Sequence, residues 1–234
     1  MNTLLHVDHI HTFIEQFHIL EGVTVEVPAN TVTVLLGRNG AGKTTTLRSI
    51  MGLNPPTQGK ITYRGAPIHA LRPYEIAQLG IGYVPDYRAI FRKLTVEQNL
   101  KIAERNQGEL DNRLPLIFEI FPDLKRLYHW PGGQLSGGQQ QMLAVARALV
   151  SDNQLLLIDE PSEGLAPIII EQMMKAIQQL SDQTTVLLVE QNFTVASMLA
   201  QHYVIIEDGQ SVHSGLMAEL VENQTLIQKY LGAA

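Results

Sequence analysis

Hydrophobic and polar residues follow two different periods along this chain. Short apolar or alternating runs bounded by turn residues are typical of strands, and longer segments with apolar residues every three or four positions are typical of helices. The runs that predict strands are Leu4–His11, Val23–Val27, Thr31–Leu36, Lys60–Tyr63, Ile81–Val84, Leu155–Asp159, Thr185–Val189 and Tyr203–Glu207. The segments that predict helices are 43–51, 73–79, 167–181 and 193–200, with a short strand and terminal helices after the turn at 208–209.

The order of these elements indicates an α/β fold. After residue 150 strands alternate with helices, which is typical of right-handed βαβ units and a mostly parallel sheet. The two alternating runs near the N-terminus are expected to form an antiparallel β subdomain at an edge of that core.

The segment from Thr95 to Val150 has a helical pattern without predicted strands. Breaks are expected at Gly108, Pro115, Pro122 and the loop 131–133. We therefore expect a single domain, 1–234, in which an α-helical subdomain is inserted into the α/β core. The predicted core is 1–85 with 151–234, and the predicted helical subdomain is 86–150.

The composition of the chain limits the classes of function that it can have. A chain of 234 residues with 45% hydrophobic residues can bury a full core, and a net charge of −6 gives no support for a nucleic-acid partner. The longest apolar runs are far shorter than the roughly 20 residues that a membrane-spanning helix needs, so no transmembrane segment is expected. The N-terminus lacks the pattern of an export signal, and the absence of cysteine excludes disulfides, so a cytosolic location fits.

A glycine-rich segment lies between the predicted strand ending at Leu36 and the following helix, and it fits G-x-x-x-x-G-K-[ST]. In this context the glycines let backbone N–H groups point at phosphate oxygens, and the helix N-terminus adds partial positive charge. Lys43 is expected to reach the β- and γ-phosphates, and the Thr44 hydroxyl to ligate Mg²⁺. The expected nucleotide-binding residues are Gly37, Arg38, Asn39, Gly40, Ala41, Gly42, Lys43, Thr44 and Thr45. The segment predicts a P-loop NTPase core of the RecA-like type.

Two carboxylates follow the buried strand Leu155–Asp159 directly. Ligands of open α/β sheets gather at the carboxyl ends of the strands, so Asp159 and Glu160 are expected close to the phosphates. Asp159 can hold Mg²⁺, and Glu160 can polarise the water that attacks the γ-phosphate.

The segment Leu135–Gln139, followed by a predicted helix and by Asp159, Glu160 and Pro161, resembles the signature sequence of ABC ATPases. The resemblance implies a head-to-tail dimer that binds two ATP molecules at its interface. In each site the signature of one subunit closes over the γ-phosphate held by the P-loop of the other. The signature residues expected to contact ATP are Ser136, Gly137, Gly138 and Gln139.

Four further segments are similar to those of the ATPases of branched-chain amino-acid importers and of the allied urea or amide importers: 83–91, 94–100, 163–167 and 188–192. The resemblance implies an ATP-hydrolysing importer subunit, peripheral at the cytoplasmic face of the membrane. Its implied partners are transmembrane permease subunits, a second ABC ATPase subunit and, indirectly, a periplasmic or extracellular solute-binding protein. The sequence leaves open the solute, and also whether the dimer is formed by identical or different ATPases.

Three positions depart from the family pattern. Asp86 stands where the family usually has a glutamine that contacts Mg²⁺ or the attacking water, and Gln191 stands where it usually has a histidine on the γ-phosphate. Gln191 can still donate that hydrogen bond, but it cannot titrate. Phe13 is the best match for the aromatic residue that stacks on adenine, and a core aromatic residue is an equally good interpretation of it.

Two other classes of function fit the sequence less well. A soluble ABC protein that works on DNA or ribosomes would need insertions or basic surfaces that the chain lacks. A non-hydrolysing nucleotide-gated module would have little use for Glu160. An N-K-x-D motif for guanine is absent, so a small GTPase is disfavoured.

Overall fold

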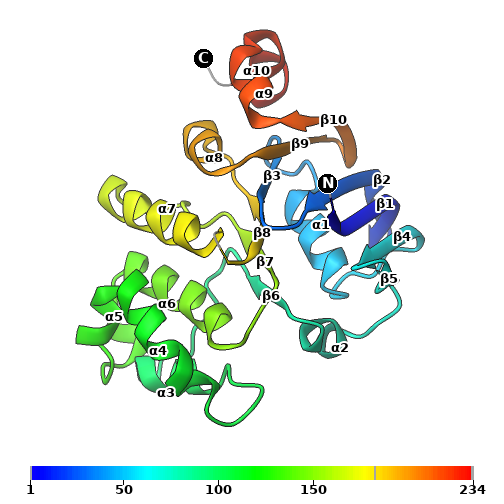
Figure 1. Ribbon diagram of the computed structural model, residues 1–234. Coiled ribbons are helices and arrows are strands. Elements are labelled where there is room, and N and C mark those ends of the chain that lie inside the picture. The colour runs from blue at the N-terminus through cyan, green and yellow to red at the C-terminus, as the bar shows by residue number, and fades with distance from the viewer. Residues whose placement is uncertain (1, 182, 233–234) are drawn as a thin grey trace.

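The computed structural model describes residues 2–181 and 183–232, arranged as two sheets with helices packed against them (Figure 1). The strands are β1 (Thr3–Ile14), β2 (Phe17–Pro28), β3 (Val32–Leu36), β4 (Gln58–Tyr63), β5 (Ala66–Pro67), β6 (Ile81–Val84), β7 (Leu155–Asp159), β8 (Thr185–Val189), β9 (His202–Glu207) and β10 (Gln210–Leu216). The helices are α1 (Lys43–Ile50), α2 (Pro73–Gln78), α3 (Val96–Lys101), α4 (Glu109–Ile120), α5 (Pro122–Arg126), the 3-10 turn η1 (Gly132–Gln134), α6 (Gly137–Val150), α7 (Pro167–Ser181), α8 (Phe193–Leu199), α9 (Met217–Glu222) and α10 (Gln224–Leu231).

The larger sheet has the strand order β10-β9-β3-β8-β7-β6, in which only the pair β9 and β10 is antiparallel. The smaller sheet, β2-β1-β4-β5, is antiparallel throughout. The predicted α/β class, with a mostly parallel sheet and an antiparallel N-terminal part, is confirmed. Because β3, β8 and β7 are parallel neighbours, their carboxyl ends meet at one edge, where the phosphate loop and the two carboxylates emerge.

The larger sheet separates two apolar cores. Leu156 and Ile158 of β7 pack with α6, α7 and the helical region on one face, whereas Leu155 and Leu157 pack with α1 and the antiparallel sheet on the other. Figure 1 shows α6 and α7 on one side of the sheet and α1 on the other. A strand covered on both faces is apolar along most of its length, which explains the hydrophobic run Leu155–Ile158 before the carboxylate that ends β7.

Two predictions about local structure differ from the structure. The predicted break at Pro115 is wrong, because α4 continues through it while Leu110 and Ile117 remain buried in the core. Proline interrupts one backbone hydrogen bond of a helix, and here the apolar face of α4 carries on across that gap. The first two strands are also longer than predicted, since β1 and β2 form a hairpin of 12-residue strands with exposed polar edges.

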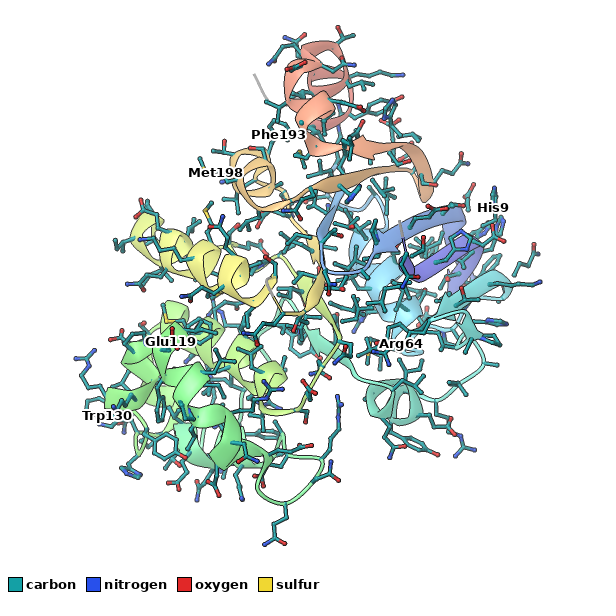
Figure 2. The ribbon with its side chains drawn as sticks, viewed as in Figure 1. His9, Arg64, Glu119, Trp130, Phe193 and Met198 are labelled. Carbon is teal, nitrogen blue, oxygen red and sulfur yellow. The ribbon has the colours of Figure 1, made fainter. Side chains whose placement is uncertain are left out.

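The described part of 86–150 contains helices α3 to α6 and the turn η1, which share their apolar core with one face of the larger sheet. Trp130 lies on the outside of this region, about half exposed, and His9 projects from the β1–β2 hairpin on the opposite side of the molecule (Figure 2). Among the described residues, no helix combines the length and the hydropathy that crossing a bilayer requires.

Candidate nucleotide site

The loop between β3 and α1 takes its shape from three glycines with left-handed φ angles, Gly37 at 142°, Gly40 at 80° and Gly42 at 109°. A Cβ added to Gly37 would lie 2.1 Å from the backbone oxygen of Ile206, so no other residue fits there without moving β9. Helix α1 begins at Lys43 and has no side-chain cap. Its first N–H groups are therefore available to an anion at the positive end of the helix.

Lys43 lies at the centre of the site and is only 4% exposed. Its Nζ donates hydrogen bonds to the backbone oxygens of Gly37 at 2.9 Å and Arg38 at 3.0 Å, and it lies 3.9 Å from Oε1 of Glu160. Burial lowers the pKa of Lys43, and the nearby carboxylates of Glu160 and Asp159 oppose that shift. The lysine therefore links the glycine loop to the acidic end of β7.

Asp159 is fully buried at the end of β7. The Thr44 hydroxyl donates to Oδ1 of Asp159 at 3.0 Å, and the Tyr83 hydroxyl donates to Oδ2 at 3.4 Å. Burial raises the pKa of Asp159 to about 6, and the charge of the nearby Asp86 acts in the same direction. Tyr83, whose own pKa burial raises, was not predicted from the sequence.

The paired oxygens of Thr44 and Asp159 fit Mg²⁺, a hard cation that prefers oxygen ligands. Among the described residues, no group of three or more His, Asp and Glu side chains is arranged to hold a metal ion. Asp86 is exposed and accepts a hydrogen bond from the backbone N–H of Tyr87, with its charge close enough to affect Asp159.

Glu160 follows β7 in a left-handed conformation, with φ of 45°. Its backbone N–H donates to the Val189 oxygen at 3.0 Å, and its Oε1 accepts a hydrogen bond from Nε2 of Gln191 at 2.7 Å. A non-glycine residue in this conformation costs on the order of 1 kcal/mol or more, so the surrounding contacts must hold it. Lys43 at the start of α1, Glu160 after β7 and Gln191 after β8 thus lie close together, and their roles in catalysis stay predictions.

A cavity of about 420 Å³ lies over the glycine loop. It is lined by Ile14, Ile19, Asn39, Gly40, Gly42, Lys43, Thr44, Thr45, Glu160, Glu163 and Gln191. Ile14, Ile19 and Glu163 were not predicted. The negative charge of Glu160 raises the pKa of Glu163, which places a second carboxylate close to the first.

Phe13 is not among the residues that line this cavity. Its ring is stacked on that of His18, with centroids 4.2 Å apart and an angle of 3° between the planes, and it is 42% exposed. Its stacking on adenine stays a prediction. The side chains that the hairpin presents to the cavity are instead Ile14 and Ile19.

The signature residues form the N-terminus of α6. Ser136 and Gln139 cap the helix reciprocally, since the Ser136 Oγ accepts from the Gln139 N–H and the Gln139 Oε1 accepts from the Ser136 N–H. Gly138 packs against Ile169, and a Cβ on Gly137 would lie 3.2 Å from Nη1 of Arg88. None of the four residues 136–139 lines the cavity over the glycine loop. Within one chain, the two glycine-lined helix ends therefore do not share a cavity.

Comparison with known proteins identifies the family. The family model described as ABC transporter matches residues 20–163. The chain is 39% identical to the high-affinity branched-chain amino acid transport ATP-binding protein BraG of Pseudomonas aeruginosa, covering 98% of this chain and 100% of that protein. It is 30% identical to the lipopolysaccharide export system ATP-binding protein LptB of Escherichia coli, covering 92% of this chain and 91% of that protein.

A solved structure agrees with these matches. The crystal structure of a nucleotide-free ATP-binding cassette from an ABC transporter superposes with a TM-score of 0.85 at 25% identity, covering 97% of this chain and 96% of that one. The glycine loop, Lys43, Asp159 and Glu160 lie together at the carboxyl-end edge of the larger sheet. The chain therefore belongs to the ABC transporter family, and it is an ATP-hydrolysing ATP-binding cassette.

Proposed function

We propose that this cassette energises the import of branched-chain amino acids through separate permease subunits, at the cytoplasmic face of the membrane. Support comes from the full-length similarity to BraG, whose identity of 39% exceeds the 30% to LptB. Residues 86–150 serve in this proposal as the helical subdomain that contacts the permease, and a solute-binding protein on the other side delivers the solute.

The arrangement of the glycine loop, α1 and the end of β7 supports a specific mode of ATP binding. In this proposal the backbone N–H groups of the loop 37–42 and of the uncapped first turn of α1 would donate to the phosphates. Lys43, whose Nζ bonds the Gly37 oxygen in the structure, would reach the β- and γ-phosphates. Thr44 and Asp159 would hold Mg²⁺, with Asp86 as a further oxygen donor nearby. When bound, the ion neutralises charge on the β- and γ-phosphates.

Hydrolysis requires one water molecule, positioned in line with the bond between the γ-phosphorus and the β–γ bridging oxygen. Glu160 accepts a proton from this water as its oxygen bonds to the γ-phosphorus, and the bridging oxygen leaves with ADP. Gln191 donates its amide hydrogen bonds toward Glu160 and the γ-phosphate, which fixes the direction of the carboxylate. Glu160 is the group that distinguishes hydrolysis from simple binding.

The signature residues and the glycine loop of one chain lie apart. This separation supports an ATP site that is shared between two chains. Because the residues 136–139 lie outside the cavity of their own chain, a second cassette must supply them to the γ-phosphate. The second cassette is another copy of this chain or a related ATPase. ATP then stabilises the closed dimer, and hydrolysis releases it.

Uptake measurements test the proposed solute. In cells that depend on this chain, Glu160→Gln should abolish uptake of radiolabelled leucine, isoleucine and valine, whereas Glu171→Gln, an exposed carboxylate on α7, should leave it unchanged. Labelled urea and acetamide are the comparison solutes. Normal leucine uptake with loss of urea or acetamide uptake would contradict the branched-chain assignment.

A further inference from the structure

A buried carboxylate lies behind the nucleotide site at the end of β8. Glu190 is 2% exposed and directly follows Val189. Its Oε2 accepts a hydrogen bond from the Ser162 hydroxyl at 2.7 Å, and its Oε1 accepts from the backbone N–H groups of Gln191 at 2.8 Å and Asn192 at 2.9 Å. Both oxygens are therefore used, although neither touches the cavity.

These contacts join two segments that flank the site. Ser162 follows Glu160 by two positions, and Gln191 donates its side-chain amide to Glu160 at 2.7 Å. The backbone N–H of Glu160 also bonds the oxygen of Val189. The contacts thus close a ring that runs from Glu160 through Ser162 and Glu190 to Gln191 and back to Glu160.

Packing alone does not account for a carboxylate at this position. Burying an ionised group costs several kcal/mol unless hydrogen bonds satisfy it, and apolar residues of similar size are generally as stable or more so. The carboxylate of Glu190 instead fixes the orientation of the backbone, because it accepts hydrogen bonds from two consecutive N–H groups and from the Ser162 hydroxyl of the opposite segment. A glutamine side chain has several rotatable bonds, so its amide reaches Glu160 reliably only if its backbone is held.

From this ring we infer that Glu190 is a positioning residue, which holds Gln191 and the segment after Glu160 in register so that the Gln191 amide orients the Glu160 carboxylate. The inference rests on the proposed roles of Glu160 and Gln191 in hydrolysis. It also makes the loops 160–166 and 190–192 one mechanical unit, in which a displacement of either loop moves the other.

The contacts require the shape of Glu190 and not its charge. A glutamine can place its carbonyl oxygen where Oε1 now accepts the two N–H groups, and its NH₂ can donate to the Ser162 oxygen, whose hydroxyl is free to rotate. Alanine removes every one of these contacts. The pair Glu190→Gln and Glu190→Ala therefore separates geometry from charge.

Steady-state hydrolysis of Mg·ATP by the purified full chain is the first test. In Glu190→Ala we expect kcat to fall about tenfold or more, because two buried N–H groups lose their acceptor and Gln191 loses its fixed position. The KM for ATP should stay within about twofold, since Glu190 does not line the cavity. Glu190→Gln should restore kcat to within about threefold of the parent chain. A dead Glu190→Gln variant would overturn the inference, because it would show that the charge itself is required.

Hydrogen exchange of the full chain is the second test, and it applies even if Glu190→Ala is poorly folded. Ser162→Ala removes one contact, and it should accelerate exchange at the amides of 191 and 192 as well as in 160–166. The control is Ser49→Ala, at a residue outside the ring. This variant removes the buried hydrogen bond of 2.9 Å between the hydroxyl groups of Ser49 and Thr12, which is similar in length to the bond between Ser162 and Glu190. It should lower stability without faster exchange at 191 and 192. Unchanged exchange at 191 and 192 in Ser162→Ala would refute the mechanical unit.

The role of Glu160 in hydrolysis and the positioning role of Glu190 can be tested separately. If Glu160→Gln retained normal turnover, the proposed function of Glu160 would be wrong, whatever the Glu190 variants did. If Glu160→Gln were inactive but Glu190→Ala kept the parent kcat with only a lower Tm, the hydrolytic mechanism would stand and Glu190 would be merely structural.

Discussion

The side-chain amide of Gln191 donates a hydrogen bond of 2.7 Å to Oε1 of Glu160. This contact places a group that cannot titrate beside the carboxylate that we propose acts on the attacking water. An imidazole at the same position would change charge near neutral pH, and its effect on Glu160 would change with it. The amide keeps its effect on Glu160 constant over that range.

We therefore predict that the pH profile of kcat contains no step that depends on position 191. Gln191→Ala should lower kcat without altering the shape of the profile, and Gln191→His should add a step near the ordinary histidine pKa of about 6.5. ATPase rates from pH 5.5 to 9 measure this. A step in the parent chain that Gln191→Ala removes would be incompatible with this account.

Glu160→Gln should reduce turnover by roughly 10² to 10⁴, the range expected when a general base is removed. ATP binding should remain, because the glycine loop and Lys43 are untouched, and an ATP-bound dimer should accumulate. Phosphate release and equilibrium binding of ATP measure the two effects separately. Glu171→Gln on α7 is the control, and loss of binding in parallel with turnover would argue against the role of Glu160 as base.

Asp159 gives a prediction about stability and pH. Burial raises its pKa in the folded chain to about 6, above the ordinary value of 3.8, so the folded chain binds the proton more tightly than the unfolded chain does. The stability that protonation contributes is complete below pH 3.8 and is lost as the pH rises through 6. Without nucleotide and Mg²⁺, Asp159→Asn should therefore be more stable than the parent at pH 8, by about 3 kcal/mol.

The advantage of Asp159→Asn should shrink as the pH falls from 8 to 5, which urea unfolding at several pH values can follow. The order should also reverse when Mg·ATP is present, because the amide is a poorer ligand for the ion. A constant difference across the pH range would show that the buried charge of Asp159 is not the cause.

Gly37 and Gly40 offer a matched test of the loop. Both have left-handed φ angles, but a Cβ on Gly37 would lie 2.1 Å from the oxygen of Ile206, whereas a Cβ on Gly40 would meet nothing within 4 Å. Gly40→Ala should cost roughly 1 kcal/mol of stability, from backbone conformation alone. Gly37→Ala should cost clearly more, and it should also weaken ATP binding because β9 or the loop must move. Equal effects in urea unfolding and ATP titration would contradict this explanation.

Several elements could be predicted from the sequence because a single physical demand determines them. The run Leu155–Asp159 had to be a strand covered on both faces, and a carboxylate at its end had to lie at the ligand edge of a parallel sheet. The phosphate-binding function of the glycine loop could also be predicted, since a simple turn requires neither the lysine nor the hydroxyl of this motif. In the structure Lys43, Asp159 and Glu160 lie together at that edge, linked through Thr44 and the 3.9 Å ion pair.

Other features depend on contacts that the sequence does not encode locally. The register of β1 on β2 shifts between Thr12 and Phe13, and such shifts decide which side chains of the hairpin face the glycine loop. Ile14 and Ile19 could not be distinguished from Phe13 for this reason. In the sequence, Glu190 could not be distinguished from an ordinary exposed polar residue after a strand. Its burial and its hydrogen bond from Ser162 depend on a tertiary contact between the two loops.

The central claim is that the glycine loop of one chain and the signature of another hold the same ATP. The chain contains no cysteine, so Asn39→Cys and Ser136→Cys can be introduced together without competing thiols. Mild oxidation with ATP in the Glu160→Gln background, followed by non-reducing electrophoresis, is the decisive measurement. We predict a covalent dimer that forms only when ATP is present. A disulfide within single chains, or ATP bound at full occupancy by monomers without any cross-link, would contradict the shared site.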